Sequence, residues 1–291
     1  MAKFDIHQEV TDRIIAALED GKTPWQCPWV GGGSTMPLRA TGQAYRGVNV
    51  LMLWARAMQD GYTARRWFTF KQAKELGAQV RKGEKGCKVV YYKVAERERE
   101  DGTEARIPFL KSYTVFNAEQ IDGLPETCAN DAAEIPLPGT TVSESLQGFF
   151  RRAGVTLDHS DERRAYYDIK ADRVHMPNPE TFHSEQGYFA TLAHESVHWT
   201  GAASRLDRFQ TFNTKKDLAR EELVAEIGAA MLCAMLGIEN DYDQNAAYLD
   251  SWLDCLREDK RAIFKAATAA QAGADFVMEA ADAALVLGEA A

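Results

Sequence analysis

HESVHWTG, residues 194–201, is the stretch around which the C-terminal half of the chain is organised. It places His194 and His198 four residues apart, with Glu195 directly after the first histidine. Positions i and i+4 of an α-helix lie on one face, roughly 5–6 Å apart at Cβ. Two neutral imidazoles at that separation can bind one divalent ion, usually zinc, while Glu195 faces a water molecule as its general base. The stretch therefore predicts the site of a zinc hydrolase on a single helical turn.

The residues around the motif favour a helix independently of it. Ser184 followed by Glu185 is a typical helix start, and Gly201 is a typical stop. Between them, apolar side chains recur at helical spacing: Tyr188, Phe189, Leu192, Ala193, Val197 and Trp199.

A third ligand is expected from the next helix, REELVAEIGAAML, residues 220–232, because catalytic zinc usually has three protein ligands and one open position. Its apolar face is interrupted by Glu221, Glu222 and Glu226. Glu222 and Glu226 are four residues apart and share a face, so one can bind the metal while the other accepts a hydrogen bond from a ligand histidine. The alternative is that all three are solvated surface glutamates.

HESVHWTG followed by EELVAEIGAA resembles the zincin-type metallopeptidase domain of the ArdC family of plasmid antirestriction proteins. Related domains occur in conjugative-plasmid primases and phage polyvalent proteins. The resemblance implies that Glu222 is the third ligand and that Glu226 is hydrogen-bonded behind the metal, with Glu221 as the alternative ligand. It also implies a bound Zn²⁺, or another divalent metal such as Mn²⁺, and Glu195 as the catalytic base.

The composition is that of an ordinary globular protein. Of the 291 residues, 45% are hydrophobic and 26% are charged, which predicts one or two domains with buried cores. No apolar run approaches the length of a membrane span, and MAKFDIHQEVTDR has no secretory signal, so we expect a cytoplasmic protein that does not enter a membrane. The five cysteines form no C-x-x-C pair and are expected to be reduced thiols.

The two halves of the chain differ in charge. Residues 1–122 hold 19 Lys and Arg against 15 Asp and Glu, whereas the rest of the chain holds 15 against 28. Such a split predicts that the halves do different work.

We predict an α+β fold with domains at residues 1–124 and 142–291, joined by a proline-rich linker at 125–141. The first domain should hold a small mixed sheet with helices, and the second should be mostly helical with a short β-hairpin. Helices are expected at 5–20, 47–60, 70–77 and 143–154, around the two motif stretches and from 248 onwards. Strands are expected at 67–69, 87–94, 106–117, 165–170 and 173–177.

The N-terminal half carries a mixture of cations and aromatic rings. Single-stranded nucleic acid is bound by such mixtures, because cations contact phosphates and each ring that stacks on a base contributes about 1–3 kcal/mol. The alternative is that the rings are core and the cations are an ordinary solvated face. The residues we predict to bind DNA are Arg65, Arg66, Trp67, Lys71, Arg81, Lys82, Lys85 and Lys88, followed closely by Tyr91 and Tyr92.

A second resemblance covers nearly all of residues 1–122. PWQCPW, AYRGVNVLML, WFTFKQAKELGAQVRKGEKG and SYTVFNAEQIDGL are similar to the single-stranded-DNA-binding domain of the same family. The resemblance implies a protein that protects incoming plasmid or phage DNA from host restriction, with a host restriction-system protein as a potential target.

Two other functions fit the same residues. One is a protein that occludes DNA and whose metal site is structural or catalytically silent, and the other is a proteolytic toxin or regulator whose basic half recognises a protein. An intact Glu195 favours catalysis, because a structural site needs no base. The candidate donors to a developing oxyanion are Tyr166, Tyr167, Tyr248, His175 and His183.

Overall fold

The computed structural model describes residues 5–25, 35–98, 104–129, 142–210, 213–238 and 248–288. The chain divides into two compact units: Met1–Ile6 with Pro37–Asp131, and His7–Met36 with Ala132–Ala291. Residues 7–36 therefore group with the C-terminal part, whereas the sequence led us to expect them in the first domain. Most of the expected linker, residues 130–141, lies outside the described residues.

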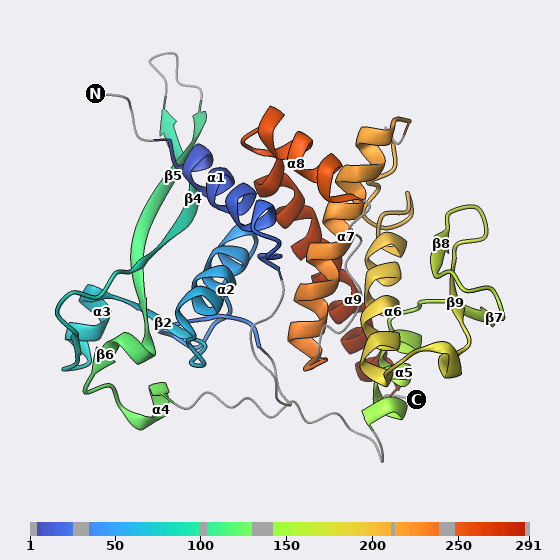
Figure 1. Cartoon of the computed structure of the whole chain (residues 1–291), viewed down its shortest axis with the longest axis horizontal. Coiled ribbons are helices and arrows are strands. Elements are labelled where there is room, and N and C mark those ends of the chain that lie inside the picture. Colours follow the sequence, from blue (N-terminus) through green and yellow to red (C-terminus); the bar gives the residue numbers. More distant parts are fainter. Residues whose placement is uncertain are drawn as a thin grey trace. The chain divides into compact units, whose positions relative to one another are not determined.

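The first unit is built on a four-stranded sheet in the order β1-β2-β5-β4 (Figure 1). β1 runs parallel to β2, and the other neighbours are antiparallel. The strands are β1 Leu38–Arg39, β2 Arg66–Thr69, β4 Cys87–Glu98 and β5 Glu104–Asn117. The predicted mixed sheet is confirmed, and the hairpin of β4 and β5 is longer than its apolar alternation indicated.

Helix α2, Val48–Asp60, packs against β4 and supplies the core of this unit. Its side chains Leu51, Leu53 and Trp54 are fully buried. Gly61 ends the helix in the left-handed conformation, with φ of 71°, which glycine adopts without steric cost. The side-chain amide of Asn49 accepts a hydrogen bond from the Val90 N–H at 2.7 Å and donates one to the Val90 carbonyl oxygen at 2.8 Å. It thereby satisfies backbone groups on the edge strand β4 that have no neighbouring strand among those described.

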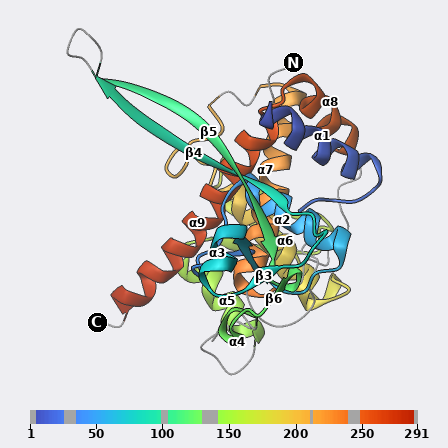
Figure 2. The same ribbon diagram turned by 90° about the vertical axis from the view of Figure 1, so that its left-hand side faces the viewer.

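Smaller elements lie at the end of the hairpin where β4 begins and β5 ends (Figure 2). Helix α3, Phe70–Glu75, starts at a capping box between Thr69 and Gln72. Strand β3, Gln79–Val80, pairs with β6, Ile121–Asp122. The 3-10 helix Ala118–Gln120 and the helical turn α4, Glu126–Ala129, complete the described part of this unit.

The second unit is a helical assembly around α7, which contacts α6, α8 and α9 (Figure 1). Small residues allow the central helices to approach closely. A Cβ on Gly228 would lie 2.8 Å from Cγ1 of Val197 in α6 and 3.3 Å from the carbonyl oxygen of Ala270 in α9. The helices are α1 Ile6–Glu19, α5 Val142–Arg152, α6 Glu185–Trp199, α7 Lys215–Leu236, α8 Leu249–Glu258 and α9 Ala262–Gly288.

Helix α1 is held against α8 and α9 by specific contacts. The Thr11 hydroxyl donates to the carbonyl oxygen of Lys260 at 2.9 Å, and Glu19 pairs with Arg257 at 2.6 Å. Farther along the chain, the ring of Trp25 packs edge-on against Trp252. These contacts explain why residues 7–36 group with the C-terminal part of the chain.

A three-stranded sheet in the order β7-β9-β8 lies beside α6. The predicted hairpin is β8, Tyr166–Asp168, with β9, Arg173–Pro177. Strand β7, Leu157–Ser160, pairs parallel to β9 and was not predicted, because LDHS has one large apolar residue and shows no alternation. Val174 and Met176 of β9 are fully buried.

The α+β fold class is confirmed. None of the helices in the described ranges is long and apolar enough to cross a bilayer. Cys87, Cys128, Cys233 and Cys255 are buried and form no disulfide with one another, and Cys27 lies outside the described residues.

Candidate metal centre

Helix α6 presents the two motif histidines to one point, as its i,i+4 spacing predicts. Ser184 caps the helix by accepting a hydrogen bond from the backbone of Gly187 at 2.9 Å. The Nε2 atoms of His194 and His198 are 3.1 Å apart. His194 is buried, with 6% of its surface exposed.

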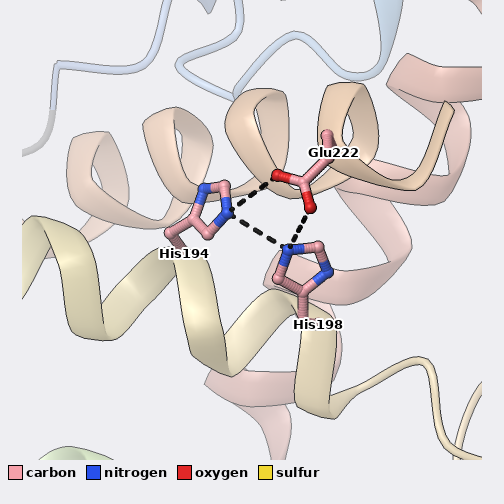
Figure 3. A group of neighbouring side chains, drawn as sticks. All are labelled: His194, His198 and Glu222. Carbon is pink, nitrogen blue, oxygen red and sulfur yellow. Dashed lines mark hydrogen bonds and ion pairs between the residues drawn. The ribbon is translucent and has the colours of Figure 1, made fainter. Parts of the chain in front are cut away.

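Glu222 of α7 completes a group of three (Figure 3). Its Oε2 lies 3.7 Å from Nε2 of His194, and its Oε1 lies 3.7 Å from Nε2 of His198. Ligands at 2.0–2.2 Å in tetrahedral geometry would be roughly 3.3–3.6 Å from one another. Two imidazole nitrogens and a carboxylate at these separations therefore fit one divalent ion with an open position. The fold thus brings His194, His198 and Glu222 together, and their role as metal ligands stays a prediction.

Glu221, the alternative candidate for the third ligand, does not face the point where His194, His198 and Glu222 meet. Its Oε1 lies 3.3 Å from Nδ1 of His198, the ring nitrogen that faces away from Glu222. The guanidinium of Arg208 donates two hydrogen bonds to the same carboxylate, at 2.7 and 3.1 Å. Glu221 is therefore placed to orient the His198 ring, whereas the resemblance implied that role for Glu226.

Glu226 lies one turn farther along α7 and is 2% exposed. Its negative charge acts on His194 by raising the pKa of that ring. A hydrogen bond from Glu226 to a ligand histidine stays a prediction.

The electrostatics of the group favour a cation. Burial opposes protonation of His194, but its ion pair with Glu222 and the charges of Glu195 and Glu226 outweigh burial and raise its pKa to about 9. Burial likewise opposes ionisation of Glu222, yet His194 and His198 hold the pKa of its carboxyl below the usual range. Three carboxylates around two imidazoles thus stabilise positive charge at the point where the ligand atoms meet.

The group opens into a cavity of about 380 Å³. The imidazole rings of His194 and His198 line it together with Glu195, which is 7% exposed. Tyr166, Tyr167 and Tyr248 line the same cavity. His194, His198 and Glu195 are thus all reached from one cavity.

The lining of this cavity divides the five candidate oxyanion donors into three that line it and two that do not. His175 and His183 do not line the cavity. His175 lies between Asp158, at 3.0 Å, and Ser160, at 3.2 Å. The Tyr167 hydroxyl donates to Asp172 and accepts from Arg205, and the Tyr166 ring stacks on His175.

Tyr248 lines the cavity too, and its role as an oxyanion donor stays a prediction. Burial raises the pKa of Tyr248, and the negative charge of Glu222 raises it further.

The predicted DNA-binding residues do not form one exposed surface. Trp67 is fully buried, so its ring is not available to a base, and its inclusion was wrong. Arg66 is partly buried, with Nη1 3.5 Å from Sγ of Cys128. Lys71 pairs with Glu75 and Arg81 with Glu84.

Of the remaining members, Lys82 and Lys85 in the turn before β4 are exposed, and Arg65 and Lys88 are partly buried. The exposed aromatic rings lie on the hairpin instead, where Tyr91, Tyr92 and Tyr113 are 50%, 63% and 47% exposed. The strand register pairs Tyr91 with Lys111 and Val89 with Tyr113, so Tyr91, Tyr113 and Lys111 share one face. Tyr113 was missed because it is far from the basic run in sequence.

Two family models match the chain. Residues 144–269 match a model described as zincin-like metallopeptidase, and residues 4–116 match one described as the N-terminal domain of anti-restriction factor ArdC. The first range contains every residue of the candidate metal centre.

Curated relatives fall into two kinds. An uncharacterized protein of Sinorhizobium fredii (strain NBRC 101917 / NGR234), y4eC, is 41% identical over 94% of this chain and 91% of that protein. Two DNA primases TraC of Escherichia coli are 38% and 36% identical over 95% of this chain. The chain spans 27% and 20% of the length of those primases.

Two solved structures are similar over the whole described fold. The metal-free crystal structure of antirestriction ArdC protein from R388 plasmid is 54% identical, with a TM-score of 0.86 over 96% of this chain and 99% of that chain. The Mn(II)-bound structure of the same protein gives a TM-score of 0.82 over 96% and 98%.

Proposed function

Since this chain belongs to the ArdC family of antirestriction proteins, we propose that it binds incoming single-stranded DNA through its first unit and hydrolyses peptide bonds at a divalent metal in its second. In this proposal the two activities together protect plasmid or phage DNA from host restriction. The observation that carries the catalytic half is the presence of Glu195 in the same cavity as His194, His198 and Glu222.

His194, His198 and Glu222 would hold Zn²⁺ or Mn²⁺. The Mn(II)-bound ArdC structure of R388 supports this assignment, and so does the spacing of the three ligand atoms here. A divalent ion at this point supplies the Lewis acidity that makes water nucleophilic near neutral pH.

Glu195 acts as general base and then general acid. Its carboxylate takes the proton of the attacking water and passes it to the leaving amide nitrogen. The phenol of Tyr248 donates a hydrogen bond to the oxygen of the tetrahedral centre as negative charge develops there.

Strand β8 would align the substrate. Among the described strands it pairs with β9 and forms one edge of the sheet β7-β9-β8. Its residues Tyr166 and Tyr167 line the cavity, so an extended peptide can add to this edge with its scissile bond over the ligand group.

The DNA surface would centre on the β4–β5 hairpin and the turn before it. Tyr91 and Tyr113 offer exposed rings on one face, and Lys111 adds a cation opposite Tyr91 on that face. Lys82 and Lys85 extend the positive surface toward phosphates.

One comparison of variants tests both halves. Glu195→Gln removes the base and leaves all three ligands in place, whereas Lys82→Glu with Lys85→Glu alters the proposed DNA surface alone. We expect the first variant to bind DNA normally but to lose proteolysis and protection of an incoming plasmid in a restricting host. We expect the second to lose single-strand affinity and protection. Full protection by Glu195→Gln would instead support a DNA-occluding protein with a silent metal site.

A further inference from the structure

Arg208 is a largely buried cation whose guanidinium donates hydrogen bonds to groups of α6 and α7. It lies in the segment between α6 and α7, and 11% of its side chain is exposed. Nη2 donates to the carbonyl oxygen of Val197 at 2.6 Å, and Nη1 donates to the Thr200 hydroxyl at 2.8 Å. Nε and Nη2 donate to the two carboxylate oxygens of Glu221 at 3.1 and 2.7 Å. The guanidinium therefore fixes the carboxylate of α7 relative to the last turn of α6.

The carboxylate held in this way contacts a proposed ligand. Oε1 of Glu221 accepts from Arg208 and also lies 3.3 Å from Nδ1 of His198. When Nδ1 carries the proton and donates to Glu221, the lone pair of the neutral ring is on Nε2. Nε2 is the nitrogen that faces His194 and Glu222.

The alternative tautomer would present an N–H to the ligand group and could not bind a metal there. A charged carboxylate opposite Nδ1 disfavours that tautomer, and a bidentate guanidinium keeps the carboxylate in one orientation. A glutamate without this clamp has three rotatable bonds and loses side-chain entropy when it is ordered.

We infer that Arg208 is a positioning residue, which acts through Glu221 to set the tautomer and orientation of His198 for metal binding. The inference rests on the proposed metal site. It adds a role for a residue that contacts neither the ligand group nor the substrate cavity.

Arg205 provides a matched control in the same segment. Its Nε donates to the carbonyl oxygen of Trp199 at 2.6 Å, so it also ties this segment to the end of α6. Its other contacts are with Asp172 and Tyr167, and its guanidinium lies 4.1 Å from the Trp199 ring centre. Loss of Arg205 therefore removes a comparable anchor without touching Glu221.

The test uses the full-length protein with ¹⁵N-labelled histidine, as wild type and as Arg208→Gln, Arg208→Lys, Glu221→Gln and Arg205→Gln. Long-range ¹H–¹⁵N spectra of the metal-free proteins, at a pH where the rings are neutral, report the His198 tautomer. Competition with a chromophoric chelator gives the affinity for Zn²⁺ and Mn²⁺, and thermal melts confirm folding.

We expect wild type and Arg205→Gln to have the same Nδ1–H tautomer of His198 and the same affinity for Zn²⁺ and Mn²⁺. Arg205→Gln should unfold at a lower temperature. Arg208→Gln and Glu221→Gln should show mixed tautomers and about 10–100-fold weaker metal binding, with partial recovery in Arg208→Lys. The inference is overturned if Arg208→Gln keeps the wild-type tautomer and affinity, or if Arg205→Gln weakens metal binding equally. A wild-type protein that binds neither metal would refute the proposed metal site, and the spectra would still decide whether Arg208 sets the tautomer.

Discussion

Glu221 and Glu222, adjacent in α7, contact opposite nitrogens of the same imidazole. Oε1 of Glu221 lies 3.3 Å from Nδ1 of His198, and Oε1 of Glu222 lies 3.7 Å from Nε2. Successive residues of a helix point about 100° apart, so one ring placed between them can meet both. The pair thus separates two tasks: Glu222 faces the point where a metal would sit, and Glu221 faces the ring from behind.

This separation predicts different effects for the same substitution at the two positions. Glu222→Gln should weaken metal binding by more than the roughly 10–100-fold expected for Glu221→Gln, because only the first change removes a ligand charge. Chelator competition on both variants measures the difference. The reverse order would make Glu221 the ligand.

The burial of Trp67 and the exposure of Tyr91 predict opposite phenotypes. Trp67→Ala should destabilise the first unit by about 3–5 kcal/mol, because it empties a fully buried site. Tyr91→Ala should leave stability within about 0.5 kcal/mol and weaken single-stranded DNA binding by about 1–3 kcal/mol. Urea unfolding and a DNA titration measure the two quantities. Tyr91→Phe keeps the ring and should bind DNA as wild type does, and equal weakening by both Tyr91 changes would argue against stacking.

The close approach of α6 to α7 at Gly228 predicts that a larger residue there would lower both stability and metal affinity. An added Cβ would meet Val197 of α6 at 2.8 Å and force α6 from α7, so Gly228→Ala should destabilise by about 1–3 kcal/mol. The same shift separates the histidines from Glu222 and should lower metal affinity. Gly148→Ala in α5 is the control, since its Cβ would meet the movable end of Arg152 at 3.2 Å. Unaltered stability and metal affinity in Gly228→Ala would show that α6 and α7 can adjust without moving the site.

The Asp172–Arg205 pair predicts a pH-dependent contribution to stability. The hydrogen bond from Arg205 is the main cause that holds the pKa of the Asp172 carboxyl below 3.8, with partial burial opposing it. Because the folded-state pKa is the lower one, the pair stabilises the protein fully above about pH 5 and loses this effect as pH falls through the folded pKa. Asp172 is 51% exposed, so the contribution should be about 0–1 kcal/mol.

The comparison is between wild type and Asp172→Asn in urea unfolding from about pH 7 to pH 3. The difference in unfolding free energy should shrink towards zero at the acid end. A difference that persists or grows there would mean that Asp172 acts through something other than its charge.

The sequence predicted the helices well because their signals are local. His194 and His198 lie on one face of any helix that contains them, and Ser184 caps that helix as expected. The choice between Glu221 and Glu222 could not be made in this way. It depends on the rotation of α7 against α6, which close packing at Gly228 and Val197 fixes.

Other features were not predicted because they, too, depend on contacts between residues that are distant in sequence. Arg208 lies in a polar segment, and nothing near it in sequence points to Glu221, 13 residues away. Trp67 belongs to a run of cations, yet its side chain is fully buried, with the Tyr62 ring edge-on to it at 6.0 Å. Strand β7 exists because β9 offers it a parallel partner.

The most direct test of the metal assignment is an anomalous-scattering map from crystals of this protein grown with Mn²⁺ or Zn²⁺. We predict one strong peak at roughly 2.0–2.2 Å from Nε2 of His194, Nε2 of His198 and a carboxylate oxygen of Glu222. Glu221 should remain on Nδ1 of His198 in the same crystals. A peak bound to Glu221, or no peak at the two histidines in metal-loaded protein, would contradict the account.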